Sequence, residues 1–267
     1  MGYFNIGHSE EKGLGSTRKS WSDIGVGLDT THSLPKFNLE AILSDPPKLH
    51  DDGRGQLISD FRIDDRTCFE LKGRLKAGFN TLETGAGLST IIFSAKGCQH
   101  TCVTPLKAEV DRIQDYCRSA NIDTSSVKFI VAPSSDIIHQ LPRATFDLVL
   151  IDGCHGFPSI FVDFYYAAKL LKIGGTLIID DMHIYTCQLA ARFIQSDPGW
   201  NVELKTKRVA VAIKTADTID MEWINQPFVV RRSRRNTLVG TWYFCLNLTK
   251  PLRSRLGLTR AQWRRRI

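Results

Sequence analysis

Three acidic residues and a histidine follow two apolar runs in the central part of the sequence. Asp152 and His155 stand just after one run, and the pair Asp180-Asp181 stands just after the next. If both runs are neighbouring parallel strands, these side chains meet at one edge of a sheet. Three carboxylates placed together there can surround a hard divalent cation such as Mg²⁺. Alternatively, Asp152 caps a helix and the acidic pair forms a solvated turn, and the residues alone leave both interpretations open.

A glycine-rich turn lies earlier in the chain, within Glu83-Thr-Gly-Ala-Gly87. Gly85 and Gly87 lack the Cβ atoms that would block a close approach of the backbone to a ligand. Ser89 and Thr90 are candidate caps of the helix expected next. The third glycine of the dinucleotide fingerprint is absent, and no Lys-Ser/Thr pair follows, so the turn does not fit a phosphate-cradling loop. An ordinary strand–turn–helix corner is the alternative.

Other polar groups stand where later strands are expected to end: Thr104, Ser135, Asp136 and His183. We expect them at the same edge of the sheet, because ligands bind outside the carboxyl ends of parallel strands.

Hydrophobic periodicity predicts the elements that position these groups. Helices are expected over 38–44, 65–75, 109–120, 157–171 and 186–196. Strands are expected from 81, over 100–104, 127–131, 146–151 and 176–179, with a turn at 174–175, and over 201–204 and 208–214 as a closing hairpin. This alternation predicts an α/β fold with a mainly parallel sheet.

Composition limits the function classes. Seven cysteines are scattered without a paired C-x-x-C spacing, which is typical of reduced thiols in the cytoplasm rather than of a disulfide framework or a zinc site. The start of the chain lacks a secretory pattern, and no apolar run approaches the roughly 20 residues that span a bilayer. We therefore expect a cytoplasmic protein.

The net charge of +7 is concentrated at one end of the chain. Residues 223–267 contain 11 Arg and Lys residues and no Asp or Glu, so the remainder is acidic on balance. We expect three parts: a flexible leader at 1–34, an α/β domain at 35–222 and a basic extension at 223–267. Residues 231–267 combine basic and apolar positions, which suits peripheral contact with an anionic membrane. Nucleic acid contact and folding back on the domain are the alternatives.

The glycine-rich turn resembles motif I of class I S-adenosylmethionine (SAM) methyltransferases. The segments 150–155, 167–175 and 178–181 resemble the metal-assisted small-molecule O-methyltransferases, of the catechol and macrolide-sugar types. The resemblance covers about residues 80–215. It implies a Rossmann-like, mainly parallel seven-stranded sheet with helices on both faces and a C-terminal antiparallel hairpin.

The resemblance also implies site roles. His155 would be the catalytic base, assisted by Asp152, while Asp152, Asp180 and Asp181 would hold Mg²⁺. The acidic residue that usually holds the SAM ribose after the second strand is absent; Thr104 stands there, and Glu109 is a substitute from the next helix. The expected SAM-binding residues are Glu83, Thr84, Gly85, Gly87, Ser89, Thr90, Thr104, Ser135, Asp136 and Asp152.

The expected function is SAM-dependent O-methylation of a small-molecule or sugar hydroxyl, with Mg²⁺ assistance. Two alternatives differ in class: a non-catalytic SAM- or nucleotide-binding interaction module, and an oxidoreductase with a nucleotide cofactor on a similar sheet. The sequence identifies neither the methyl acceptor nor the oligomeric state, and a homo-oligomer is compatible with it.

Overall fold

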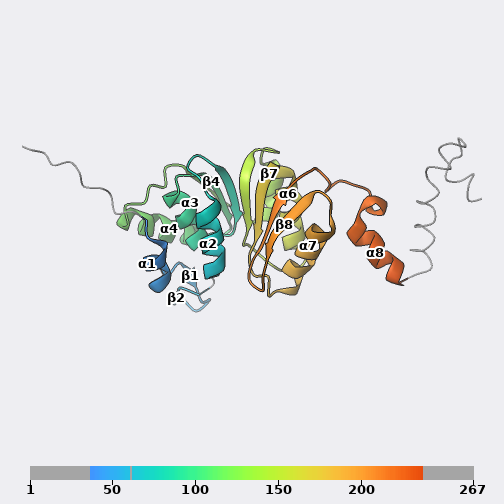
Figure 1. Cartoon of the computed structure of the whole chain (residues 1–267). Coiled ribbons are helices and arrows are strands. Elements are labelled where there is room, and N and C mark those ends of the chain that lie inside the picture. Colours follow the sequence, from blue (N-terminus) through green and yellow to red (C-terminus); the bar gives the residue numbers. More distant parts are fainter. Residues whose placement is uncertain (1–36, 61, 237–267) are drawn as a thin grey trace, which may run out of the picture. The chain divides into compact units, whose positions relative to one another are not determined.

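The computed structural model describes residues 37–60 and 62–236 (Figure 1). Its centre is a seven-stranded sheet of order β5-β4-β3-β6-β7-β9-β8. The first five strands in this order pair in parallel, and β9 pairs antiparallel with both β7 and β8. Their bounds are β3 Asn80–Thr84, β4 Gln99–Thr104, β5 Val127–Val131, β6 Phe146–Ile151, β7 Leu171–Ile179, β8 Trp200–Lys205 and β9 Ala210–Lys214.

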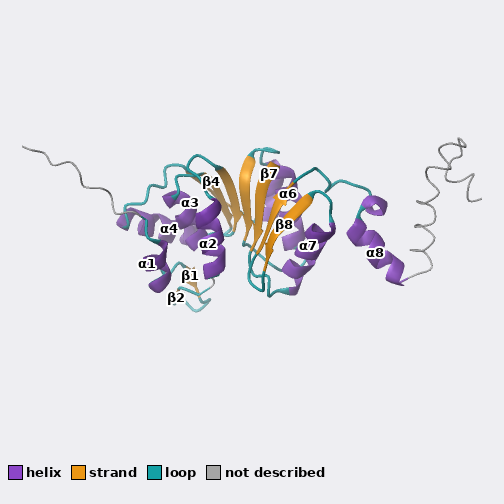
Figure 2. Cartoon of the chain, in the orientation of Figure 1, coloured by secondary structure: helices purple, strands orange, loops and turns teal. Residues whose placement is uncertain are grey.

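Helices cover both faces of this sheet (Figure 2). One face carries α2 Asp65–Arg74, α3 Leu88–Ala95 and α4 Lys107–Ser119; the other carries α6 Ser159–Leu170 and α7 Tyr185–Ser196. The remaining helices are α1 Leu39–Ser44, α5 Ser134–Ile137 and α8 Pro227–Asn236, with short 3₁₀ turns η1 Ile138–Gln140 and η2 Trp223–Asn225. A two-stranded ribbon, β1 His50–Asp51 and β2 Leu57–Ile58, stands apart from the main sheet.

The strand β6 shows why the central strands are almost entirely apolar. Leu148 and Leu150 point into the core beneath α2, α3 and α4, whereas Val149 and Ile151 point into the core beneath α6 and α7. Alternate side chains of a strand face opposite sides of the sheet, and both sides here are covered. A strand buried on both faces therefore has no polar alternation.

The predicted fold class is confirmed, including the seven strands and the closing hairpin. One local prediction is wrong: Gly174 and Gly175 do not end an element but lie inside β7. The register of β7 against β6 shifts between Phe146 and Leu148, so the two glycines accommodate an irregularity within the strand. The β1–β2 ribbon was not predicted. The expected leader and the tail beyond residue 236 lie outside the described residues.

The carboxyl ends of β3 and β6 are in direct backbone contact. The Asp152 amide donates to the Thr84 carbonyl at 3.0 Å, and the Gly85 amide donates to the Val103 carbonyl of β4 at 2.9 Å. Gly85 has a φ of +94°, and a Cβ on it would lie 2.3 Å from the Asp152 carbonyl oxygen. Only glycine allows the two strand ends to approach this closely.

We predict that Gly85→Ala destabilises the whole fold. Gly78 is a matched control, because its φ is +78° but nothing lies within 4 Å of its Cβ position. Gly78→Ala should cost about 1–2 kcal/mol of unfolding free energy from backbone strain alone, and Gly85→Ala about 1–3 kcal/mol more from the clash. Denaturant unfolding measures both, and equal losses would show that the contact between the strand ends relaxes freely.

Asp180, at the end of β7, joins the sheet to α2. The Thr67 hydroxyl donates to its Oδ1 at 2.5 Å, and the Asp64 amide donates to its Oδ2 at 3.2 Å. The residue is 1% exposed. Burial raises the pKa of Asp180 from 3.8 to about 6, although both hydrogen bonds act in the opposite direction. The charged carboxylate is therefore a net cost to the folded state.

This shift predicts a pH-dependent stability difference. The Asp180 carboxyl binds its proton more tightly in the folded state than in the unfolded state. Its contribution to the free energy of unfolding therefore falls as the pH rises from about 4 through 6. As the pH rises over this range, the free energy of unfolding of Asp180→Asn should increase by up to about 3 kcal/mol relative to that of the wild type. Asp123→Asn is the control, because hydrogen bonds from Ser125 lower the pKa of that exposed carboxyl and its effect has the opposite sign. A stability difference for Asp180→Asn that does not change with pH would contradict the prediction.

Candidate active site

A cavity of about 770 Å³ opens at the carboxyl ends of β3, β4, β6 and β7. Its walls come from the glycine-rich turn after β3 and from the segments after β4, β5, β6 and β7. Its polar lining consists of His50, Arg62, Thr104, Glu109, Ser134, Ser135, Asp152, Cys154, His155, Ser159, Asp181, His183 and Arg208. The predicted edge of the sheet therefore carries a recess lined by polar side chains.

The glycine-rich turn contributes Gly85 and Ala86 to the wall. The helix α3 begins directly after Gly87, whose amide donates to the Thr90 hydroxyl at 3.1 Å. Thr90 thus caps the helix as predicted. Ser89 accepts no capping bond from a backbone amide among the described hydrogen bonds; it is buried inside the first turn.

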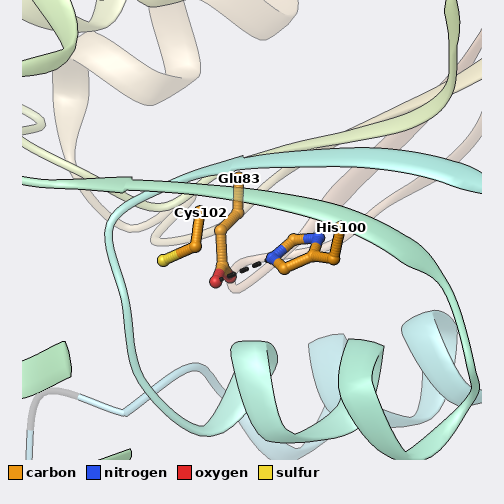
Figure 3. Close-up of side chains that lie close together, drawn as sticks. All are labelled: Glu83, His100 and Cys102. Carbon is orange, nitrogen blue, oxygen red and sulfur yellow. Dashed lines mark hydrogen bonds and ion pairs between the residues drawn. The ribbon is translucent and has the colours of Figure 1, made fainter. Parts of the chain in front are cut away.

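Several predicted SAM-binding residues lie behind this wall rather than on it. Glu83, Thr84, Ser89 and Thr90 are buried and do not line the cavity. Glu83 points toward α3, where its carboxylate meets the ring of His100 (Figure 3). The alternation of side chains along β3 explains this, because the strand is covered on both faces.

A carboxylate does stand at the end of β4, although it comes from α4. Glu109 lines the cavity, accepts the Thr104 hydroxyl at 3.3 Å, and contacts His50 Nδ1 at 2.9 Å. Glu109 is the residue that the sequence suggested as a substitute for the missing acidic residue, and the structure bonds it to Thr104. His50, from the β1–β2 ribbon, was not foreseen, because a lone histidine in a two-residue strand carries no pattern.

The segment after β5 places Ser134 and Ser135 in the cavity wall. Asp136 is exposed and absent from that wall; it accepts the Ser135 hydroxyl at 2.9 Å. The structure therefore favours Ser135, with its neighbour Ser134, over Asp136 as a residue that faces a ligand.

The segments after β6 and β7 bring Asp152, His155 and Asp181 together. His155 Nε2 lies 3.8 Å from Asp152 Oδ1 and 3.5 Å from Asp181 Oδ2, and one donor atom from each residue lies within 4.8 Å of the other two. His183 Nδ1 is 3.5 Å from the other oxygen of Asp181. Asp180 faces away, held by Thr67 and Asp64. The structure thus assembles His155, rather than Asp180, with the other two carboxylates.

Electrostatics within this cluster favour a bound proton. Burial raises the pKa of Asp152 to about 8, which His155 only partly offsets. Burial acts to lower the pKa of His155, but the neighbouring Asp152 and Cys187 outweigh it and raise the pKa to about 10. At neutral pH a proton therefore stays on the Asp152–His155 pair.

Two arginines near Asp181 were not predicted as site residues. Arg62 and Arg208 line the main cavity and also a smaller neighbouring cavity of about 300 Å³, which Asp181 borders as well. Arg208 Nε lies 3.6 Å from Asp64 Oδ2. These residues come from the segment before α2 and from the β8–β9 turn, so only the tertiary fold places them here.

Comparison with known proteins gives a match to one family model and likenesses to solved structures that share the fold. Residues 82–182 match the family model of a methyltransferase domain. TomG, an O-methyltransferase from Streptomyces achromogenes that is involved in tomaymycin synthesis, was solved in complex with SAM. It is 20% identical, with a TM-score of 0.53 over 69% of this chain and 93% of its own. A protein from Corynebacterium glutamicum is 19% identical, with a TM-score of 0.50 over 59% and 84% of the two chains.

The structural likenesses are likenesses of fold, and no curated protein matches the sequence. The matched family segment begins in β3, spans the glycine-rich turn and ends just after Asp181, so it contains the cluster described above. The family match thus shows a methyltransferase domain over residues 82–182, and the topology of the sheet agrees with that match.

Proposed function

We propose that this protein is a class I SAM-dependent methyltransferase that acts on oxygen, transferring the methyl group of SAM to a hydroxyl of a small molecule or a sugar. The observation that carries the proposal is the cluster of Asp152, His155 and Asp181 in the same cavity as the glycine-rich turn. The O-methyltransferase TomG, which shares the fold, supports the same reaction type.

SAM fits the half of the cavity between the glycine-rich turn and the segments after β4 and β5. The Thr104–Glu109 pair offers acceptors for the ribose hydroxyls, and Ser134 and Ser135 offer hydrogen bonds to the adenine edge. Gly85 and Ala86 of the glycine-rich turn border this half of the cavity. When bound, SAM supplies an electrophilic methyl group on its sulfonium.

A divalent cation such as Mg²⁺ fits the carboxylates of Asp152 and Asp181, because it prefers oxygen ligands, and it would leave the neighbouring His155 Nε2 free to act as a base. The raised pKa of Asp152 supports this fit, because a buried carboxylate without a cation partner resists ionisation. When bound, the cation would lower the pKa of the acceptor hydroxyl and orient it.

His155 is the proposed proton acceptor. The hydroxyl proton goes to Nε2, the acceptor oxygen bonds to the methyl carbon, and the carbon–sulfur bond of the sulfonium breaks. With a pKa of about 10, His155 is already protonated at neutral pH. A cation that neutralised Asp152 would remove one cause of that raised pKa and so help Nε2 to accept the proton.

The family match gives no support to the oxidoreductase alternative. The non-catalytic alternative remains testable, because a chain that binds SAM but methylates nothing would be an interaction module.

We predict that chelation removes activity near neutral pH and that Mg²⁺ restores it. Activity would be measured with methyl-labelled SAM on a panel of catechols and sugars. Without the cation, the residual rate should rise as the pH approaches 10, because His155 then loses its proton. Asp181→Asn should weaken Mg²⁺ binding, measured directly by calorimetry, whereas Asp136→Asn, an exposed carboxylate outside the cavity wall, should not. Activity that is indifferent to the chelator would leave His155 as a metal-free base.

We also propose that the basic residues 231–267 hold the enzyme on an anionic membrane surface, with a cytoplasmic location otherwise. Among the described residues no helix is long and apolar enough to cross a bilayer. The start of the tail, α8, packs on α7: the rings of Phe228 and Phe193 lie 5.6 Å apart, and the Arg232 guanidinium lies 3.7 Å from the Phe228 ring. Phe228 of α8 therefore packs on the domain, while Arg231 and Arg232 of the same helix are exposed.

We predict that the full chain co-sediments with anionic vesicles but not with neutral ones, and that the binding weakens as salt rises. A chain ending at Asn236 keeps α8 and should stay in the supernatant. If the full chain also stays there at low salt, the membrane proposal is wrong.

A further inference from the structure

Three side chains beneath the glycine-rich turn form a buried polar cluster: Glu83, His100 and Cys102. They lie on the neighbouring strands β3 and β4, with Glu83 directly opposite Cys102 in the register, and they face α3 (Figure 3). None is more than 1% exposed. Buried charged and polar groups are expensive unless hydrogen-bonded, so this cluster needs an explanation within the fold.

The hydrogen bonds of the cluster form a chain that reaches the turn. His100 Nδ1 contacts the Thr81 hydroxyl at 2.9 Å, and His100 Nε2 contacts Glu83 Oε1 at 3.1 Å. The Thr90 hydroxyl donates to the same Glu83 oxygen and accepts the Gly87 amide at 3.1 Å. These partners assign the proton to Nε2, because the carboxylate can only accept while the Thr81 hydroxyl can donate to Nδ1.

The cluster also holds Gly85, the other glycine of the turn. The Cys102 thiol donates to the Gly85 carbonyl oxygen at 3.5 Å. The backbone of Gly85 and that of Gly87 are thus both bonded to side chains that surround one buried carboxylate. All the bonds to that carboxylate fall on Oε1, since Oε2 has no hydrogen-bond partner in the described part of the chain. Removing His100 would leave Glu83 bonded only through Thr90.

We propose that His100 is a positioning residue for the cofactor: through Glu83 and Thr90 it holds the Gly85–Gly87 turn in the conformation that accepts SAM. The inference rests on the proposed SAM site in the cavity. His100 does not line that cavity, so its effect passes through the turn. A preformed turn spends no binding energy on its own ordering when the ligand arrives.

The test compares two substitutions at His100. His100→Phe keeps the stacking on Phe93, whose ring lies 4.1 Å from the imidazole at 11°, but removes both hydrogen bonds. His100→Gln restores a donor near the Nε2 position. Calorimetry with S-adenosylhomocysteine, well below the melting temperature, should show a dissociation constant about tenfold to a hundredfold higher for His100→Phe. The value for His100→Gln should lie nearer to the wild type.

Thr90→Val provides an independent check, because it removes the hydroxyl between Glu83 and Gly87 at nearly constant shape. Its loss of affinity should be similar, and the double variant His100→Phe/Thr90→Val should lose less than the product of the two single effects, since both act through one carboxylate. Cys117→Ala is the control for general destabilisation: it opens the core beneath α4 and should lower the melting temperature without changing the affinity.

The outcomes separate this inference from the proposed function. If the wild type binds neither SAM nor S-adenosylhomocysteine, the proposed cofactor is wrong and the inference falls with it. If the wild type binds and His100→Phe binds equally well, the positioning role alone is overturned. Stoichiometric zinc in the purified chain that is lost in Cys102→Ser would also overturn it, because Glu83, His100 and Cys102 would then be metal ligands.

Discussion

The backbone contact between Gly85 and Asp152 is the constraint on which the site depends. A Cβ at Gly85 would lie 2.3 Å from the Asp152 carbonyl oxygen, so the ends of β3 and β6 can touch only because the residue is glycine. This contact sets the cofactor turn directly beside the segment that carries Asp152 and His155. The proposed sites of the methyl donor and of the acceptor are thereby neighbours through one piece of backbone geometry.

Electrostatics in the cavity follow from that proximity. Asp152, His155 and Asp181 crowd into a partly buried space, and the result is a bound proton at neutral pH. Such a cluster is poorly suited to accept another proton by itself. The proposed cation at the carboxylates would resolve the conflict, because it would replace the proton as the neutralising charge and leave the imidazole free.

Below the cavity, polar groups serve a different purpose. Asp180 is bonded to Thr67 and Asp64 and so joins α2 to the sheet, while Glu83 and His100 support the glycine-rich turn from inside. Both carboxylates belong to motifs whose neighbours line the cavity, yet neither lines it. Side chains on consecutive residues of a strand point to opposite faces, so half of a strand-end motif necessarily supports the site from behind.

The sequence by itself determined the order of the elements, the mainly parallel sheet and the edge at which polar groups gather. Continuous apolar runs such as 146–151, with acidic residues after them, are sufficient for that, because a strand buried on both faces ends where polarity resumes. It also pointed to Thr104 and, separately, to Glu109, which the structure joins by a hydrogen bond. What the tertiary structure alone decided was which side chains share a space. It placed His155 with Asp152 and Asp181 and turned Asp180 and Glu83 inward. It also brought His50, Arg62 and Arg208 to the cavity from segments without a recognisable pattern. The reason is that the direction of a side chain depends on strand pleat and on the elements packed against it, and local sequence encodes neither.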